Sequence, residues 1–150
     1  MTPSTKTNNA FSLLKHRIFS EPYLSVNSVL AGVLFFVFAY SGIFSPEKNN
    51  YPVVCIHERL TGEPCASCGL SHSFSLILHG RISEAYKWNS NGMKVFIFFA
   101  AQLVMRIVFS VFYLKHPETV RQLIIYDTIA SLTLFLIAFI PFIKWIFRFL

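Results

Sequence analysis

Three long apolar runs constrain this chain more than any other feature of its sequence. Residues 26–44 contain no charged side chain and come close to the length of about 20 residues that a helix needs to cross a bilayer core. Residues 93–114 form a second run, with Lys94 near its start and Arg106 well inside it. Residues 122–143 form a third run, in which Asp127 is the only charged residue. These runs predict an all-α integral membrane protein with three transmembrane helices.

The composition excludes the two main alternatives. Of the 150 residues, 54% are hydrophobic, 17 are Phe and 13% are charged, against about 25% charged residues in a typical soluble domain. Such a chain is too apolar for a soluble monomer and too poor in charge for a disordered protein. We expect residues 23–150 to form a single membrane domain, preceded by a partly disordered tail, cytoplasmic or peripheral, at residues 1–22.

The charges flanking the runs leave the membrane orientation open. Lys and Arg are only slightly more numerous in the 45–92 connection and at the C-terminal end than in the N-terminal tail and the turn near residue 116. The positive-inside rule therefore gives only a slight preference for an N-terminus on the outside.

All three cysteines lie in the connection between the first two runs. Cys65 and Cys68 form a C-x-x-C-G sequence, which has the spacing of a zinc knuckle, and Cys55 lies upstream as a third thiol. Tetrahedral zinc accepts three thiolates and one imidazole, so a nearby histidine completes the set in this interpretation. The candidate histidines are His57, His72 and His79.

Other interpretations of the cysteines stand beside the zinc site. In an oxidising compartment two of the thiols would pair as a disulfide and leave the third reduced. Reduced thiols packed within a membrane-embedded loop are a further alternative. A redox-active pair at Cys65 and Cys68 has less support, because no thioredoxin-like pattern of strands and helices surrounds it.

The residues after Gly69 alternate at helical spacing. The expected apolar face holds Leu70, Phe74, Ile77 and Leu78, and the expected polar face holds Ser71, His72, Ser75 and His79. This pattern predicts a short amphipathic helix that ends near Gly80. Because it is too short to cross a bilayer, we expect it to be re-entrant or to lie in the interface. A second short amphipathic helix is expected over residues 81–88.

The cysteine-containing stretch also resembles a known family. In chain order, Cys55, Thr61-Gly62, Cys65, Cys68-Gly69, Ser71-His72, Leu78-His79-Gly80 and Asn89 follow the pattern C-P…T-G…C-P-x-C-G-x-T-R…L-L-H-G…N-P. This pattern is similar to that of an uncharacterised family of bacterial membrane proteins, domain of unknown function 2752. The chain departs from it at Ile56 and Ala66, which replace prolines, and at His72, which replaces an arginine.

The resemblance implies a location and a preferred ligand set, and it supplies no activity. It implies a multi-pass protein of the bacterial cytoplasmic, or inner, membrane. His79 occupies the position of the family's histidine, so the preferred zinc ligands become Cys55, Cys65, Cys68 and His79.

The two charges inside the apolar runs call for a partner, because an ionisable group within a bilayer is costly when unpaired. Arg106 and Asp127 lie at similar distances from the polar turn at residues 116–118. They are therefore expected to reach similar depths in antiparallel helices and to form a structural ion pair. An ion or proton site is one alternative, and extension of each side chain to the interface is another.

No catalytic pattern is evident in the sequence. It holds no nucleophile with a base beside it, no phosphate-binding glycine loop and no H-E-x-x-H motif. The isoelectric point near 9.4 reflects Lys and Arg beside the apolar runs, which favours contact with anionic lipid over nucleic acid. We therefore expect a non-catalytic accessory or scaffold subunit of a larger complex in the bacterial inner membrane, in contact with lipids and other integral membrane proteins. The cysteine loop, closed by zinc or a disulfide, would be its docking platform. The alternative is a membrane thiol-disulfide oxidoreductase or metal sensor that uses Cys65 and Cys68.

Overall fold

The computed structural model describes residues 20–43, 62 and 66–149. Within these ranges the regular secondary structure is entirely helical, and no strand occurs. In chain order the elements are α2 (Pro22–Ile43), α4 (Leu70–Leu78), α5 (Ile82–Trp88), α6 (Gly92–Lys115), η1 (Pro117–Thr119) and α7 (Val120–Phe149). Three of them, α2, α6 and α7, are long and apolar enough to cross a membrane, which confirms the three expected spans.

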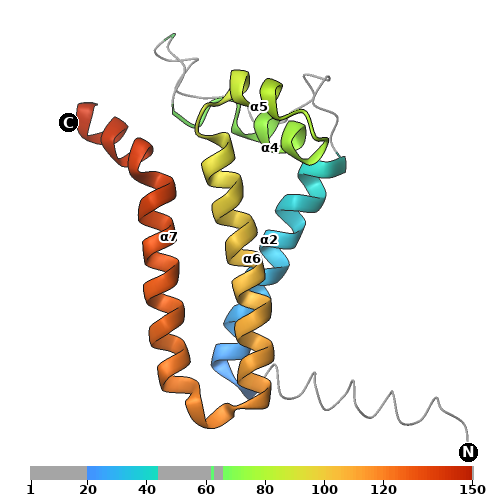
Figure 1. The fold of residues 1–150 in the computed structure, drawn as a ribbon, viewed down its shortest axis with the longest axis vertical. Coiled ribbons are helices and arrows are strands. Elements are labelled where there is room, and N and C mark those ends of the chain that lie inside the picture. The colour runs from blue at the N-terminus through green and yellow to red at the C-terminus, as the bar shows by residue number, and fades with distance from the viewer. Residues whose placement is uncertain (1–19, 44–61, 63–65, 150) are drawn as a thin grey trace, which may run out of the picture.

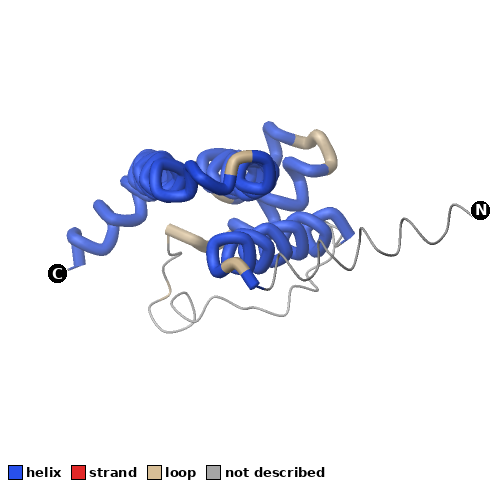
Figure 2. The backbone as a smooth tube through the Cα atoms, turned by 90° about the horizontal axis from the view of Figure 1, so that it is seen from below, coloured by secondary structure: helices blue, strands red, loops and turns tan. Residues whose placement is uncertain are grey.

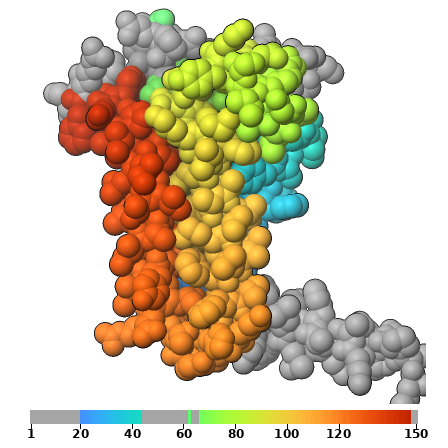
Figure 3. Space-filling view, viewed as in Figure 1, coloured from blue at the N-terminus to red at the C-terminus, as the bar shows by residue number. Residues whose placement is uncertain are grey.

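The central helix of the bundle is α6. It packs against both α2 and α7, and the short η1 turn makes α7 antiparallel to α6 (Figure 1). The α4–α5 pair, called here the α4–α5 hairpin, lies across one end of α2 and α6 (Figure 3). The C-terminal turns of α7 bend away from the other helices (Figures 1 and 2), and Pro141 lies inside this helix, where its ring removes a backbone hydrogen bond.

Aromatic and aliphatic side chains join the helices at both ends of the bundle. Near the turn, Leu24, Tyr113 and Leu123 form a buried cluster that connects α2, α6 and α7. Near the hairpin, the Phe74 ring of α4 lies edge-on to Phe96 and Phe99 of α6, with centroid distances of 5.4 and 5.8 Å. Edge-to-face rings fill space and add an electrostatic attraction, so these three Phe residues serve helix packing.

The outer surfaces of the long helices are apolar. Large hydrophobic side chains such as Phe36, Ile43 and Phe147 are mostly exposed. Exposed apolar surface on this scale is what a lipid environment accommodates and water does not. The fold is therefore that of a membrane protein.

The short helices begin and end close to the predicted positions, but the predicted faces of α4 are partly wrong. Ser75, expected on the polar face, is fully buried, and Leu78, expected on the apolar face, is exposed. The reason is that α2, α5 and α6 all contact α4, so the buried surface covers consecutive residues from Ser73 to Leu76. Small hydroxyl side chains allow this close packing. Gly80 adopts a φ of 77° just after the helix, as a C-terminal glycine does.

Several predictions fall on residues that the structure does not describe. Cys55, Cys65, His57 and nearly all of the 1–22 tail lie outside the described ranges.

Candidate functional site

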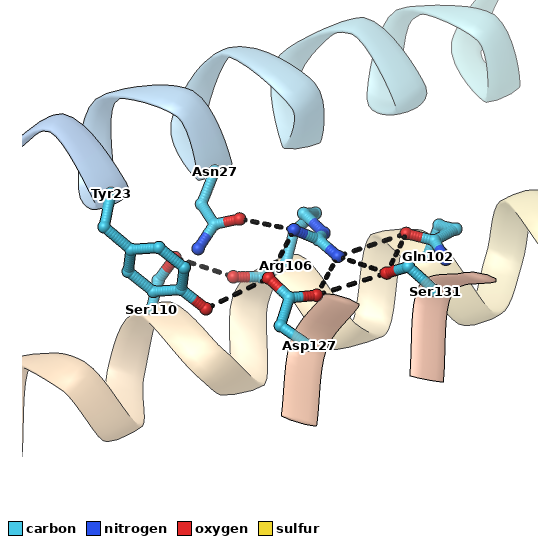
Figure 4. Close-up of polar contacts among 7 residues, drawn as sticks. All are labelled: Tyr23, Asn27, Gln102, Arg106, Ser110, Asp127 and Ser131. Atoms are coloured by element: carbon cyan, nitrogen blue, oxygen red, sulfur yellow. Dashed lines mark hydrogen bonds and ion pairs between the residues drawn. The ribbon is translucent and has the colours of Figure 1, made fainter. Parts of the chain in front are cut away.

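A group of polar side chains lies between the three long helices, and we call it the polar node (Figure 4). Its members are Tyr23 and Asn27 of α2, Gln102, Arg106 and Ser110 of α6, and Asp127 and Ser131 of α7. Arg106 and Asp127 are both buried and form an ion pair. The two ionised groups that the sequence places within the apolar runs therefore contact each other directly.

The Arg106 guanidinium joins all three long helices. One terminal nitrogen donates to Asn27 Oδ1 and to Asp127 Oδ2, each at 2.7 Å. The other donates to Asp127 Oδ1, to Ser131 Oγ at 2.8 Å and to Gln102 Oε1 at 3.3 Å. The planar fork of arginine suits this two-point contact with a carboxylate.

The Asp127 carboxylate has further donors besides arginine. Tyr23 donates its hydroxyl to Asp127 Oδ2 at 3.1 Å, and Ser131 donates to Oδ1 at 3.2 Å. A buried ion pair repays its desolvation only when such additional hydrogen bonds satisfy the remaining lone pairs. The carboxylate meets that condition.

Three buried donors of the polar node have no acceptor among the described residues: Asn27 Nδ2, Gln102 Nε2 and Arg106 Nε. Asn27 and Gln102 lie on opposite sides of the guanidinium (Figure 4), so these donors do not converge on a single ligand. The node therefore has the geometry of a tie between helices rather than of a binding pocket. Sequence reasoning named Arg106 and Asp127 alone, although amides and hydroxyls within apolar runs are a signal that could have revealed the other members.

A second organised region is the start of the α4–α5 hairpin, where Asn89 holds the chain around the C-x-x-C-G sequence. Asn89 is buried, and its side-chain nitrogen donates to the carbonyls of Ala66 at 3.0 Å and Cys68 at 2.9 Å. Its side-chain oxygen accepts from the Asn91 amide at 2.8 Å. One side chain thus fixes the segment before α4 against the segment before α6, and we call this the Asn89 clamp.

Two glycines permit close backbone approach around the clamp. Gly69, at the N-cap of α4, has a φ of 75°, and a Cβ there would lie 2.7 Å from the Trp88 carbonyl oxygen. Gly92, at the start of α6, faces Ser73 so closely that a Cβ would lie 2.0 Å from its Oγ. Gly69 therefore requires glycine for conformational and steric reasons, and Gly92 for the steric reason alone.

Aromatic stacking further supports the hairpin. The His72 ring stacks on the Trp88 ring with a centroid distance of 4.2 Å and an interplanar angle of 6°. This contact joins the first turn of α4 to the last residue of α5. His72 replaces the arginine of the family pattern, so the flat contact with Trp88 is one that either side chain could make.

The described members of the predicted zinc set lie at opposite ends of α4. Cys68 precedes the helix and His79 follows it, so about 16 Å of helical rise separates them. The structure therefore does not bring His79 to Cys68, whereas His72 lies at the same end of the helix as Cys68. His79 Nδ1 lies 2.7 Å from the Ser75 carbonyl oxygen.

A surface ion pair lies at the start of α5. Arg81 Nη2 lies 2.6 Å from Glu84 Oε2, and Arg81 Nε donates to Glu84 Oε1 at 2.8 Å. This hydrogen-bonded arginine holds the pKa of the Glu84 carboxyl below its usual range.

Three long apolar helices, a buried ion pair between them and a hairpin of short helices across one end place this chain among the membrane proteins. Residues 55–103 match the family described as Protein of unknown function (DUF2752), which confirms the resemblance seen in the cysteine pattern. The match includes α4, α5 and the first half of α6. The clamp residue Asn89 and both closely packed glycines lie within it, whereas Asp127 lies outside. No curated protein and no solved structure matches the chain.

Proposed function

We propose that this chain is a non-catalytic accessory or scaffold subunit of a larger complex in a bacterial inner membrane. The α4–α5 hairpin, lying in the interface between lipid and water, is its docking platform. One observation carries the proposal: the Asn89 clamp fixes a hairpin whose second helix exposes apolar side chains. Ile82, Tyr86 and Trp88 of α5 are each half exposed or more.

The exposed apolar side chains of α5 have the character of an interaction surface. Ile82 and Tyr86 lie four residues apart and so share one face of the helix. Aromatic side chains held on a rigid support lose little entropy on binding and dominate many protein interfaces. Because aromatic rings also settle at the lipid headgroup layer, the experiment has to separate the two roles.

The test compares two tyrosines with similar exposure. Tyr86 on α5 is 62% exposed and Tyr126 on α7 is 67% exposed. In mildly solubilised native membranes, the wild-type protein should migrate in native gels well above its own mass. Tyr86→Ala should abolish the larger assembly at an unchanged protein level, and Tyr126→Ala should leave it intact. Migration at the monomer mass for the wild type, or equal loss in both variants, would contradict the platform.

A metal site or a thiol redox function in the C-x-x-C segment is the second candidate. The Asn89 clamp favours it, because hydrogen bonds to the Ala66 and Cys68 carbonyls fix the backbone beside Cys68. We propose Cys55, Cys65 and Cys68 as zinc ligands. For the fourth ligand the geometry favours His72, which lies at the same end of α4 as Cys68, over His79, which the family pattern indicates but which lies at the other end.

Metal analysis of the purified protein, with a thiol count under denaturing conditions, tests the second candidate. One equivalent of zinc that is lost in Cys68→Ser and in His72→Ala, and retained in His79→Ala, supports the set with His72. Loss of zinc in His79→Ala and retention in His72→Ala would instead identify His79 as the fourth ligand. Absence of metal with a rapidly alkylated, acidic thiol at Cys65 or Cys68 would favour the oxidoreductase, and a missing pair of thiols would favour a disulfide.

The described charges favour the cytoplasm as the compartment of the hairpin. Arg81, Lys87, Lys94 and Lys144 lie on the hairpin end of the bundle, whereas Lys115 and Arg121 lie on the turn end. Over the full sequence, seven Lys and Arg residues lie on the hairpin side of the spans and five on the turn side, so the positive-inside rule gives the hairpin end a slight preference for the cytoplasm. A fluorescent protein fused after Leu150 should then be bright in bacterial cells, and an alkaline phosphatase fused at the same position should be inactive. The reverse result would place the cysteines in the oxidising compartment.

A further inference from the structure

Helix α7 is longer than a membrane span needs to be. Its 30 residues rise about 45 Å, whereas the hydrocarbon core of a bilayer is about 30 Å thick. From Val120 to Pro141 the rise is about 32 Å, so this part of the helix is enough to cross the core. The turns after Pro141, residues 142–149, therefore begin where the core ends, and we call them the C-terminal arm.

The C-terminal arm departs from the direction of the bundle near Pro141. Proline removes a backbone hydrogen bond and bends a helix, and the arm points away from α2 and α6 (Figures 1 and 2). The arm lies at the level of the α4–α5 hairpin, on the other side of α6 (Figure 1). A helix that bends at this depth can follow the interface between lipid and water instead of extending into the solvent.

The side chains of the arm suit that interface. Ile146 and Phe147 are 52% and 73% exposed, and Lys144 is exposed as well. Lys144 and Ile146 lie two residues apart and so occupy opposite faces of the helix. The sequence places a second cation, Arg148, one helical turn after Lys144. Helices with cations on one face and large apolar residues on the others are typical of segments that lie in an anionic membrane surface.

We propose that the C-terminal arm is an in-plane anchor that binds anionic phospholipids. Ile146 and Phe147 insert below the headgroups, and Lys144 pairs with the lipid phosphates. The apolar side chains alone would suit any phospholipid, so the cations are the reason for an anionic partner. The proposal does not depend on the docking role of the hairpin, because it uses residues of α7 and the docking surface lies on α5.

The fluorescence of Trp145 reports the depth of the arm. The full chain with Trp88→Phe keeps Trp145 as its only tryptophan, and it retains an aromatic ring at position 88. This protein is reconstituted into phosphatidylcholine that carries bromine atoms at a defined position of the acyl chain. Bromine close to the headgroup should quench Trp145 more strongly than bromine close to the terminal methyl group. Equal or stronger quenching by the deeper bromine, or no quenching by either lipid, would overturn the in-plane placement.

The lipid preference is tested in the same protein with two matched variants. Brominated phosphatidylglycerol in a phosphatidylcholine bilayer should quench Trp145 more than brominated phosphatidylcholine does at the same fraction. Lys144→Gln should lower this preference about fivefold, the factor that one cation contributes near an anionic surface. Lys115→Gln removes an exposed charge at the turn end and should leave the preference unchanged. Equal quenching by the two lipids before substitution, or equal effects of the two substitutions, would overturn the proposal.

Discussion

The polar node and the Asn89 clamp both connect separate segments of the chain, the first between the long helices and the second at one end of the bundle. Both use one side chain to hold separate segments together. Arg106 bonds to groups on three helices across the bundle, and Asn89 bonds to backbone groups of a nearby loop. The node depends on full charges within the apolar runs, whereas the clamp depends on neutral hydrogen bonds at the end of the bundle.

This difference predicts how far the destabilisation caused by a substitution spreads from each region. Lipid cannot hydrate a charge that loses its partner, so damage to the node should propagate to all three helices. Water can replace hydrogen bonds lost at the end of the bundle, so damage to the clamp should remain local.

Asp127→Leu should be the most destructive substitution. It leaves the Arg106 guanidinium buried without its carboxylate, and breaking a buried pair in this way costs about 4 kcal/mol of unfolding free energy. Denaturation of the protein in detergent micelles, followed by circular dichroism, measures the loss.

The double variant Arg106→Leu/Asp127→Leu serves as the control for the node. It removes both charges, so much of the lost stability should return. A double variant that is no more stable than Asp127→Leu alone would mean that the remaining polar members, rather than the ion pair, determine the stability of the node.

Gly69→Ala should have the next largest effect. Its φ of 75° and the 2.7 Å approach to the Trp88 carbonyl combine to cost about 3 kcal/mol. Gly80→Ala is the matched control, because φ is 77° there but nothing lies within 4 Å of the new Cβ, and it should cost about 1 kcal/mol. Equal melting temperatures of the two variants would contradict this prediction, because they would show that the Trp88 backbone shifts to accommodate the new Cβ at little cost.

Asn89→Ala should destabilise the hairpin by about 2 kcal/mol, because three hydrogen bonds are lost and the freed carbonyls regain water in part. Hydrogen exchange should accelerate in α4 and α5 and stay unchanged around Asp127. Ser90→Ala, at the exposed neighbouring position, is the control. Faster hydrogen exchange throughout α6 and α7 in Asn89→Ala would contradict this prediction, because the effect of the clamp would then extend over the whole bundle.

The Arg81–Glu84 pair should matter least, since both side chains are well exposed to solvent. The pKa of Glu84 is lowered in the folded protein, so its small stabilising contribution is present above the unfolded pKa and is lost as pH falls through the folded pKa. A carboxyl NMR titration should find the Glu84 pKa below the usual range in the wild type and within it in Arg81→Gln. An identical titration in the two proteins would remove Arg81 as the cause.

Much of the architecture was predictable from the sequence, because the length of a hydrophobic run indicates the length of the helix that can span the membrane. Residues 93–114 became α6, with bounds at Gly92 and Lys115, and Gly80 follows α4 as predicted. The faces of α4 were not predictable from periodicity, because a short helix covered on several sides buries Ser73 and Ser75 as well as Phe74. Periodicity assumes that only one side of a helix is covered.

The three spans, the two short helices and the similar depths of Arg106 and Asp127 follow from residue type and position along the chain. Three further features are visible only in the folded chain: Asn27, Gln102 and Ser131 bond to Arg106, Asn89 bonds to the Ala66 and Cys68 carbonyls, and α4 separates Cys68 from His79. The physical reason is that these contacts depend on how helices rotate and pack against one another, which local spacing does not encode.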